Sequence, residues 1–302
     1  MGKIAFLFSG QGDQYVGMGK DLYENYSTAK DVFEKLSKIR PTTKEQCFEG
    51  DEEALKQTKN TQPCLFAMEM AGASVLKEKG IVPSCVAGFS LGEVVALTYA
   101  GYATFEDGFN LVCKRGEIMQ AEAEKHNTSM VAVVKLTPDV VKELASKYTH
   151  VYPVNFNCPG NISVSGDAEQ ILTFSNDVKE AGGRAIPLKV KGAFHSPYMA
   201  SASQNFAKEL EKTNFKKAEV ELYSNLTAKP YGENIKELLS KQISNPVLWE
   251  EIIKNMLNSG VDTFIEIGPG KTLSNMVAKI NNEVKVYSIS NIEQILSEVK
   301  ND

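Results

Sequence analysis

The fold is decided by the stretch Cys85-Val-Ala-Gly88-Phe-Ser90-Leu-Gly92 and by residues 93–100 that follow it. Its first three residues are apolar and predict a buried strand, and residues 93–100 predict a helix that Gly101 ends. A serine between two glycines at a strand-to-helix turn has the G-x-S-x-G pattern of a nucleophile elbow. Such a turn places the Ser90 hydroxyl at the positive end of the helix, where the free N–H of Leu91 can face a developing oxyanion. The alternative is an ordinary glycine turn with a solvated serine.

The composition is that of a globular protein with a large core. The chain has 302 residues, of which 42% are hydrophobic and 24% charged, and its net charge is −5. The length predicts one large domain, or one domain with an insertion, and the acidic balance argues against a nucleic-acid partner. The five cysteines are scattered and lack C-x-x-C spacing, so we expect neither a disulfide framework nor a metal site. We expect the protein to lie in a reducing compartment. The apolar run 4–8 is too short for a signal peptide or a membrane span, so we expect a soluble cytoplasmic protein without membrane contact.

Two glycine-rich stretches imitate nucleotide sites without meeting their requirements. Residues 3–8 predict a buried strand that ends in the loop Ser9-Gly-Gln-Gly-Asp-Gln14, and ligands collect at such strand ends in open α/β sheets. A dinucleotide fingerprint would need glycine at position 15, which is tyrosine, so the Rossmann interpretation is weak. The sequence Gly270-Lys-Thr272 resembles the end of a P-loop, but isoleucine stands at position 265, where the first glycine is required. We therefore reject nucleotide binding there.

Two long helices are predicted before residue 125. One covers Gln62–Lys79 with Pro63 in its first turn, and the other covers Thr104–Glu124 with Thr104 as N-cap. On the second helix, Arg115 lies beside an apolar stripe of residues at steps of four and three. The chain has only three arginines, so an arginine at the edge of an apolar face needs a reason. A snorkelling side chain or an ion pair is the ordinary reason, and the spacing alone favours it.

Residues 130–190 have a pattern of their own, in the β-α-β-β-α-β order of ferredoxin-like folds. The predicted elements are Met130–Leu136, Pro138–Lys147, Val151–Phe156, Ile162–Ser165, Asp167–Ala181 and Arg184–Val190. We therefore predict an α/β protein in which a large α/β-hydrolase-like domain with a parallel sheet, residues 1–126 and 192–302, carries an inserted ferredoxin-like subdomain, residues 127–191. After the insertion we expect helices at 197–213, 234–243 and 247–259 and strands at 220–223 and 263–267.

A serine hydroxyl needs a base before it can act as a nucleophile, and histidine is the usual one. Of the three histidines, His126 lies in a charged segment and His150 in a connection of the predicted subdomain. His195 lies in the loop where the chain re-enters the large domain, so elimination predicts it as the base, and the alternative is an isolated loop histidine. No acidic residue presents itself as a third member, but a backbone carbonyl can also orient the imidazole.

Taken in order, these motifs resemble those of the malonyl-CoA:acyl-carrier-protein transacylases and of the acyltransferase domains of polyketide synthases, over the full length of the chain. The matching segments are Gly10–Gln14 for GQGxQ, Gly88–Glu93 for GHSLGE, Gly192–Ser196 for GAFHS, Gln242–Trp249 for QxxNPVxW and Gly268–Lys271 for GPGK. One position departs, because the family usually has histidine before the nucleophile and this chain has Phe89. That residue is not the base, so the resemblance still implies intact chemistry and puts only the contacts of an imidazole there in question.

The resemblance also implies a role for each matching site residue. These are Ser90 as the acylated nucleophile, His195 as the base, Gln11 and Leu91 as backbone donors of the oxyanion hole, Arg115 as the ligand of the free malonyl carboxylate, Gln242 as the backbone acceptor that orients His195, and Met119, Met130 and Phe194 as the lining of the acyl pocket. Phe194 before the histidine fits malonyl better than methylmalonyl, whose pattern puts a smaller residue there. No cofactor or metal is implied.

The implied activity is ping-pong transfer of a malonyl group from malonyl-CoA to the phosphopantetheine thiol of an acyl carrier protein, by a protein that we expect to be a monomer. The alternatives are a discrete trans-acting acyltransferase of a polyketide synthase, a serine acyl hydrolase, and a non-catalytic synthase partner in which Phe89 marks decay. Carrier proteins are typically acidic, as this chain is, so docking needs a local basic patch. Lys189 and Lys191, which flank the histidine loop, are the candidates.

Overall fold

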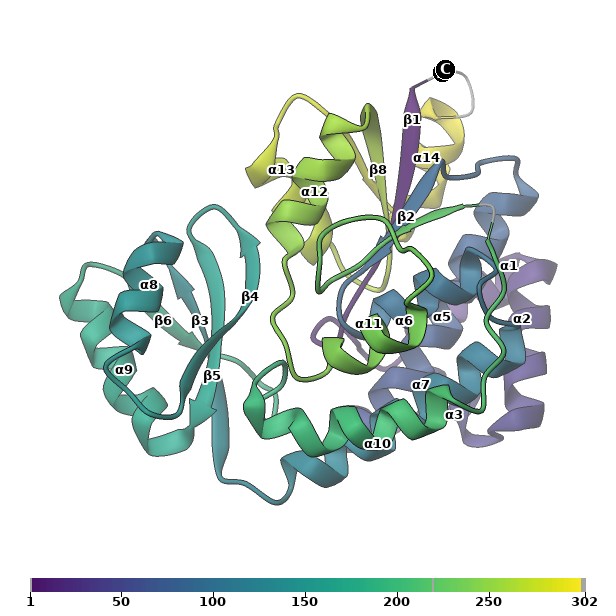
Figure 1. Ribbon diagram of the computed structural model, residues 1–302. Coiled ribbons are helices and arrows are strands. Elements are labelled where there is room, and N and C mark those ends of the chain that lie inside the picture. The colour runs from purple at the N-terminus through teal and green to yellow at the C-terminus, as the bar shows by residue number, and fades with distance from the viewer. Residues whose placement is uncertain (1, 219, 300–302) are drawn as a thin grey trace.

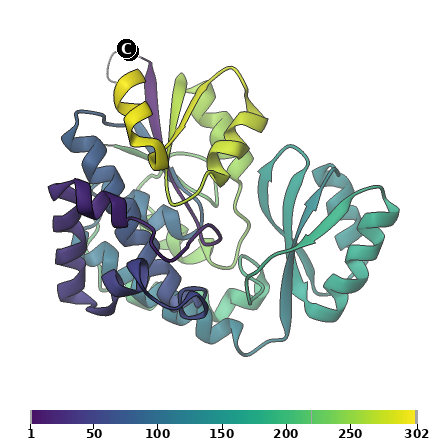
Figure 2. The same ribbon diagram turned by 180° about the vertical axis from the view of Figure 1, so that it is seen from behind.

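The computed structural model describes residues 2–218 and 220–299, which contain two separate β-sheets surrounded by helices (Figures 1 and 2). The larger sheet is parallel throughout and has the strand order β7-β2-β1-β8-β9. Its strands are β1 (Lys3–Phe8), β2 (Cys85–Gly88), β7 (Glu221–Tyr223), β8 (Val261–Ile267) and β9 (Lys285–Ser288). Because β2 and β8 flank β1 on opposite sides, the loops after these three strands meet at one edge of the sheet, where ligands bind in open α/β folds.

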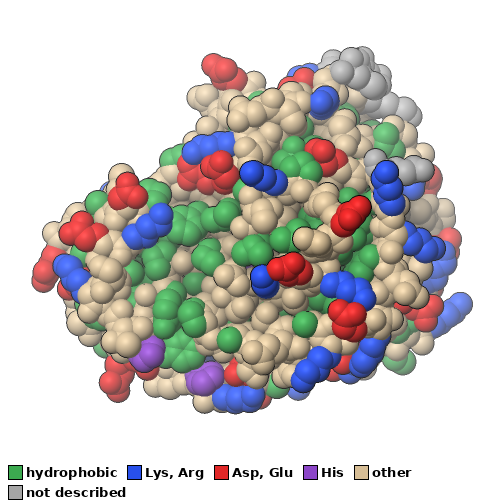
Figure 3. Space-filling view, viewed as in Figure 1, with side chains coloured by type: hydrophobic (Ala, Val, Ile, Leu, Met, Phe, Trp, Pro, Cys, Tyr) green, Lys and Arg blue, Asp and Glu red, His purple; other side chains and the backbone are tan. Residues whose placement is uncertain are grey.

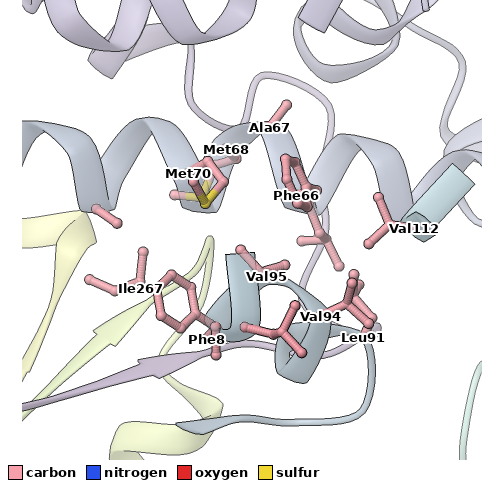
Figure 4. Close-up of a cluster of buried hydrophobic side chains, with 14 of the residues drawn as sticks. Phe8, Phe66, Ala67, Met68, Met70, Leu91, Val94, Val95, Val112 and Ile267 are labelled. Carbon is pink, nitrogen blue, oxygen red and sulfur yellow. The ribbon is translucent and has the colours of Figure 1, made fainter. Parts of the chain in front are cut away.

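Helices cover both faces of the parallel sheet, because successive side chains of a strand point to opposite faces. Phe8 belongs to the larger apolar cluster, together with Leu91, Val95 and Ile267 (Figure 4). Its neighbour Leu7 belongs to a second cluster on the opposite face. The helices of the first face include α5 (Thr58–Glu78), α6 (Leu91–Tyr99) and α7 (Phe105–Ala123), and those of the second are α12 (Trp249–Asn258) and α13 (Thr272–Ile280). The predicted parallel-sheet α/β architecture is confirmed.

The remaining helices of the larger part surround this core. They are α1 (Lys20–Asn25), α2 (Ser27–Ile39), α3 (Thr42–Phe48), α4 (Glu52–Leu55), α10 (Ala200–Leu210), α11 (Ile235–Gln242) and α14 (Ile292–Glu298), with short 3₁₀ turns at Pro197–Met199 and Ile289–Asn291. Helix α7 begins directly after the predicted N-cap, and the Thr104 hydroxyl accepts a hydrogen bond from the Asp107 N–H. No helix among the described residues has both the length and the apolar character needed to cross a membrane.

Helix α5 differs from its prediction. It begins at Thr58, four residues before the expected start, and Pro63 lies inside it rather than in its first turn. Side chains of the added turn form hydrogen bonds with the preceding segment. The Asn60 amide donates to the Ala54 carbonyl at 2.9 Å, and the Thr61 hydroxyl donates to the Leu55 carbonyl. Tertiary contacts therefore override the helix start that the proline indicates.

The smaller sheet is antiparallel and has the strand order β4-β5-β3-β6. Its elements in chain order are β3 (Thr128–Val134), α8 (Pro138–Ala145), β4 (Val151–Cys158), β5 (Asn161–Asp167), α9 (Ala168–Glu180) and β6 (Arg184–Pro187). Both helices pack on one face of the sheet, over a cluster that includes Val133, Val164 and Phe174. This order and this packing confirm the ferredoxin-like prediction, while the exact domain boundaries at 126/127 and 191/192 stay a prediction.

Three further elements differ in extent from their predictions. Strand β6 ends at Pro187 rather than Val190, although the Leu188 N–H still donates to the Met130 carbonyl oxygen at 2.9 Å. The predicted helix 197–213 is a 3₁₀ turn followed by α10, which ends at Leu210. Helix α12 begins two residues late, because Val247 pairs with β4 of the smaller sheet: its N–H donates to the Val154 carbonyl at 2.8 Å. That backbone pairing also fastens the smaller sheet to the larger part of the molecule.

Candidate active site

The tight turn after β2 depends on two glycines. A Cβ atom on Gly88 would lie 1.9 Å from the backbone of Gly92, and a Cβ on Gly92 would lie 2.3 Å from the Phe8 carbonyl oxygen. Between them, Ser90 has φ 56° and ψ −105°, a conformation that L-residues rarely adopt. The Ser90 N–H donates to Oδ1 of Asn225 at 2.7 Å, which fastens the strained turn to the loop after β7. The predicted elbow is therefore present and raises the serine above the sheet.

The Ser90 hydroxyl meets the imidazole of His195. The Ser90 Oγ lies 2.8 Å from His195 Nε2, and His195 Nδ1 lies 2.9 Å from the backbone carbonyl oxygen of Gln242. A carbonyl only accepts, so Nδ1 carries the proton and Nε2 is free to accept the serine proton. Burial, together with the charge of Arg115 nearby, lowers the pKa of His195 to about 4. The imidazole is therefore neutral at pH 7 and is available as a base.

Arg115 reaches the same hydroxyl from α7. It is fully buried, its Nη2 lies 3.2 Å from Ser90 Oγ and 2.7 Å from Gln242 Oε1, and burial lowers its pKa to about 10. The guanidinium therefore stays cationic at pH 7. Its Nε and Nη1 are buried without an acceptor among the described residues. A buried cation with unpaired donors beside a nucleophile can bind an anionic group.

The two predicted oxyanion donors lie beside the serine. Gln11 follows β1 and Leu91 begins α6, and both line the cavity that contains Ser90. Leu91 N–H is at the positive end of α6, where the first helical N–H groups have no partner within the helix. Neither backbone N–H has an acceptor among the hydrogen bonds of residues 2–218 and 220–299. Both N–H groups are therefore left without an acceptor at residues that line the cavity.

The cavity at Ser90 lies between the two parts of the molecule and measures about 80 Å³. Figure 3 shows hydrophobic side chains gathered across the middle of one face of the molecule. The three predicted pocket residues line it, as do four that the sequence analysis missed; the seven are Met119, Met130 and Phe194, and Gln62, Asn155, Leu188 and Val190. Gln62 and Asn155 each have a buried side-chain oxygen without a donor among the described residues. For Asn155, a polar amide in a mostly apolar strand is a signal that would have singled it out, whereas Gln62 follows the polar residues 58–61 and carries no such signal.

A buried polar network lies below the cavity. Glu93 Oε1 accepts from the Tyr231 hydroxyl at 2.7 Å and from the Asn225 N–H at 2.8 Å, while Glu93 Oε2 accepts from Gln242 Nε2 at 2.6 Å. Sequence reasoning assigned no role to Glu93, Tyr231 or Asn225. The available signal was an acidic residue in the first turn of an otherwise apolar helix.

The other candidates do not line this cavity. His126 and His150 are exposed and pack against Tyr198. The centroids of their rings lie 5.1 and 5.9 Å, respectively, from the centroid of the tyrosine ring. Lys189 and Lys191 are exposed, on the segment that leads to the histidine loop. A larger cavity of about 1040 Å³ lies between α10, α11 and the segment after α10, but none of the predicted site residues lines it. The described residues contain no group of three or more His, Cys, Asp or Glu side chains that could hold a metal ion.

Comparison with known proteins places this geometry in a family. The model of the acyl transferase domain matches residues 5–295. The chain belongs to this acyl transferase family. Among curated relatives, the malonyl CoA-acyl carrier protein transacylase of Bacillus subtilis is 42% identical over 98% of this chain and 96% of its own length, and that of Synechocystis is 36% identical over 98% and 99%. The resemblance seen in the motifs is thereby confirmed.

Solved acyl transferase structures share the fold over the whole chain. The malonyl CoA-acyl carrier protein transacylase from Clostridium perfringens superposes with a TM-score of 0.95 at 40% identity, covering 99% of this chain and 98% of that one. A malonyl-transacylase solved in complex with a type II polyketide acyl carrier protein superposes with a TM-score of 0.95 at 31% identity, covering 99% and 100%. These neighbours support a large α/β part that carries a small subdomain.

Proposed function

We propose that this protein transfers a malonyl group from malonyl-CoA to the phosphopantetheine thiol of an acyl carrier protein through a malonyl-Ser90 intermediate. The observation that carries the proposal is the meeting of Ser90, His195 and Arg115 in one buried cleft, with guanidinium nitrogens left unpaired. A nucleophile, a neutral base and a cation select an activated acyl group that ends in an anion. The names of the two bacterial relatives, malonyl CoA-acyl carrier protein transacylases, agree with this substrate.

In the first half-reaction, His195 Nε2 takes the proton as Ser90 Oγ attacks the thioester carbonyl carbon. The N–H groups of Gln11 and Leu91 stabilise the resulting oxyanion. The carbon–sulfur bond then breaks, and His195 returns the proton to the departing CoA sulfur. In the second half-reaction, His195 deprotonates the carrier thiol, which attacks the Ser90 ester, and the serine recovers its proton.

The acyl unit is selected by charge and shape. Arg115 pairs with the malonyl carboxylate through a planar fork that can hold both oxygens. Met119, Met130 and Phe194 surround the short carbon chain. Each step uses side chains and backbone of one protomer, so we propose a monomer that needs no cofactor. The five free cysteines support a cytoplasmic location.

A product assay separates this function from that of a serine acyl hydrolase. The protein is incubated with malonyl-CoA with and without a phosphopantetheinylated carrier, and both malonyl-carrier and free malonate are measured. We expect malonyl-carrier to form much faster than malonate. A carrier-independent release of malonate as the main product would identify a hydrolase instead, and no turnover would identify a non-catalytic partner.

The solved complex with a type II polyketide carrier favours one second candidate, a discrete trans-acting acyltransferase of a polyketide synthase. The reaction chemistry is the same and only the carrier differs. Parallel assays with a fatty-acid carrier and a polyketide carrier compare the two values of kcat/KM. The carrier with the higher value identifies the pathway, and we expect the fatty-acid carrier to be preferred.

A further inference from the structure

We propose that Glu93 is a positioning residue for Arg115, which it holds in place through the side-chain amide of Gln242, and that it thereby enforces the preference for a carboxylated acyl group. The inference rests on the proposed function, in which Arg115 binds the malonyl carboxylate. It assigns a task to a carboxylate that takes no part in the proton transfers.

Gln242 contacts all three reactive residues. Its Nε2 donates to the Ser90 carbonyl oxygen at 2.6 Å, its Oε1 accepts from Arg115 Nη2 at 2.7 Å, and its backbone oxygen accepts from His195 Nδ1 at 2.9 Å. The side chain is 1% exposed, so water does not compete for these bonds. Whatever fixes the orientation of this amide also fixes the position of the guanidinium.

Glu93 and the Ser90 carbonyl oxygen together fix that orientation, because both accept from the amide nitrogen. An ionised carboxylate only accepts hydrogen bonds, so the amide nitrogen of Gln242 must face Glu93 Oε2, at 2.6 Å, and the amide oxygen must face Arg115. A neutral amide at position 93 can present either a donor or an acceptor. Only the Ser90 carbonyl oxygen would then require the present orientation of Gln242. A side chain that turned over would direct its NH₂ group at the guanidinium and leave Arg115 without its acceptor.

The indirect contact suits a substrate-binding arginine. Arg115 is fully buried and needs a nearby negative charge, and Glu93 is the carboxylate whose charge acts on it. A direct ion pair would occupy the guanidinium fork. With Gln242 between them, Glu93 stabilises the cation while Nε and Nη1 stay unpaired for the incoming carboxylate.

Glu93 is itself held firmly. The Tyr231 hydroxyl and the Asn225 N–H both donate to its Oε1, at 2.7 and 2.8 Å. Burial raises the pKa of Glu93 to about 7, while these bonds, the bond from Gln242 and the charge of Arg115 oppose that rise. At pH 8 the side chain is ionised, which is the state that the positioning role requires.

The test compares two acyl donors in three proteins at pH 8. Wild type, Glu93→Gln and the matched control Glu266→Gln are each mixed with malonyl-CoA or acetyl-CoA, and kcat/KM for Ser90 acylation is followed by intact-protein mass. Glu266 is likewise fully buried, but it accepts from the N–H groups of Leu273 and Ser274, outside the network. For Glu93→Gln we expect about a tenfold loss with malonyl-CoA, as for one hydrogen bond to a charged group, and less than about a twofold loss with acetyl-CoA. For Glu266→Gln, the ratio of kcat/KM with malonyl-CoA to kcat/KM with acetyl-CoA should match that of wild type.

Equal losses of kcat/KM for both donors would show that Glu93 only supports the fold. No loss with either donor would show that Glu93 does not position Arg115. Either result overturns the inference. Absence of malonylation already in the wild type would instead refute the proposed function, and the inference with it. If Glu93→Gln does not fold, Tyr231→Phe replaces it. That variant removes one bond to Glu93, and we expect its malonyl-to-acetyl ratio to fall about threefold; an unchanged ratio there would also overturn the inference.

Discussion

The Ser90 hydroxyl lies between a nitrogen that accepts a proton and a nitrogen that donates one. His195 Nε2 lies 2.8 Å from Oγ, and Arg115 Nη2 lies 3.2 Å from it. The guanidinium stabilises negative charge that develops on the oxygen, and the same charge opposes protonation of the imidazole. One cation therefore prepares the nucleophile, keeps its base neutral and, in the proposed reaction, binds the substrate.

The low pKa of His195 predicts that activity persists to an unusually low pH. Because burial and Arg115 hold that pKa at about 4, Nε2 stays unprotonated as the pH falls from 8 to 5 and is protonated only as the pH passes through about 4. We expect kcat/KM for Ser90 acylation by acetyl-CoA to stay level over that range and then to fall. A half-maximal rate near pH 6.5 would contradict this. His126→Gln, which alters an exposed histidine, should leave the profile unchanged.

Arg115 is predicted to govern charge selection. Arg115→Ala should lower kcat/KM for malonyl-CoA about a hundredfold, since it removes a charge-assisted bidentate contact, and should leave acetyl-CoA within a few-fold of wild type. Arg115→Lys keeps the charge without the planar fork and should give an intermediate value. Initial acylation rates with both donors provide the measurement, and unchanged malonyl kinetics in Arg115→Ala would remove this residue from the site.

At the scale of elements, α6 and β1 approach so closely at the elbow that only glycine fits between them. A Cβ on Gly92 would lie 2.3 Å from the backbone oxygen of Phe8, and neither backbone can move without disturbing the sheet. The same approach holds the first turn of α6 beneath the serine. The geometry of the nucleophile is therefore a property of how this strand and this helix pack.

Gly92→Ala should consequently destabilise the protein. We expect its free energy of unfolding to fall by about 2 kcal/mol or more, which is the usual cost of overpacking. Gly232→Ala is the matched control, because a Cβ there meets no atom within 4 Å, and it should change the free energy of unfolding by less than about 0.5 kcal/mol. Urea denaturation measures both values; equal stability of the two variants would show that the elbow tolerates a side chain.

Sequence reasoning succeeded where the signal is local. The elbow, the N-cap at Thr104 and the alternation of the ferredoxin-like part depend on neighbouring residues, and the structure contains all three. It failed where long-range contacts decide the outcome. The start of α5 depends on bonds from Asn60 and Thr61 to an earlier segment, and the positions of Gln62 and Asn155 in the cavity depend on how two sheets face each other.

In the whole molecule, the two parts of the chain lie side by side (Figure 1), and residues of both line the cavity at Ser90. The parallel-sheet part contributes Ser90 and Arg115, and the antiparallel part contributes Met130 and Asn155. The backbone pairing of Val247 with β4 fixes the distance between them. A carrier that delivers its thiol to Ser90 must therefore approach where both parts are exposed.

Lys189 and Lys191 lie beside that approach and are exposed, so they are expected to attract an acidic carrier. The double charge reversal Lys189→Glu, Lys191→Glu should raise KM for the carrier several-fold at low salt, while the rate of Ser90 acylation by malonyl-CoA provides the internal reference. Lys147→Glu alters an exposed lysine elsewhere on the small part and should leave that KM unchanged. If the double reversal also leaves it unchanged, these lysines do not form the docking surface.

In the proposed reaction, Ser90 carries the malonyl group between donor and carrier. Intact-protein and peptide mass spectrometry follow wild type and Ser90→Ala after addition of malonyl-CoA and then of phosphopantetheinylated carrier. The account predicts a malonyl adduct on the peptide that contains Ser90, its disappearance as malonyl-carrier forms, and no adduct in Ser90→Ala. An adduct of the same mass in Ser90→Ala, or an adduct on Ser90 that the carrier cannot remove, would contradict it.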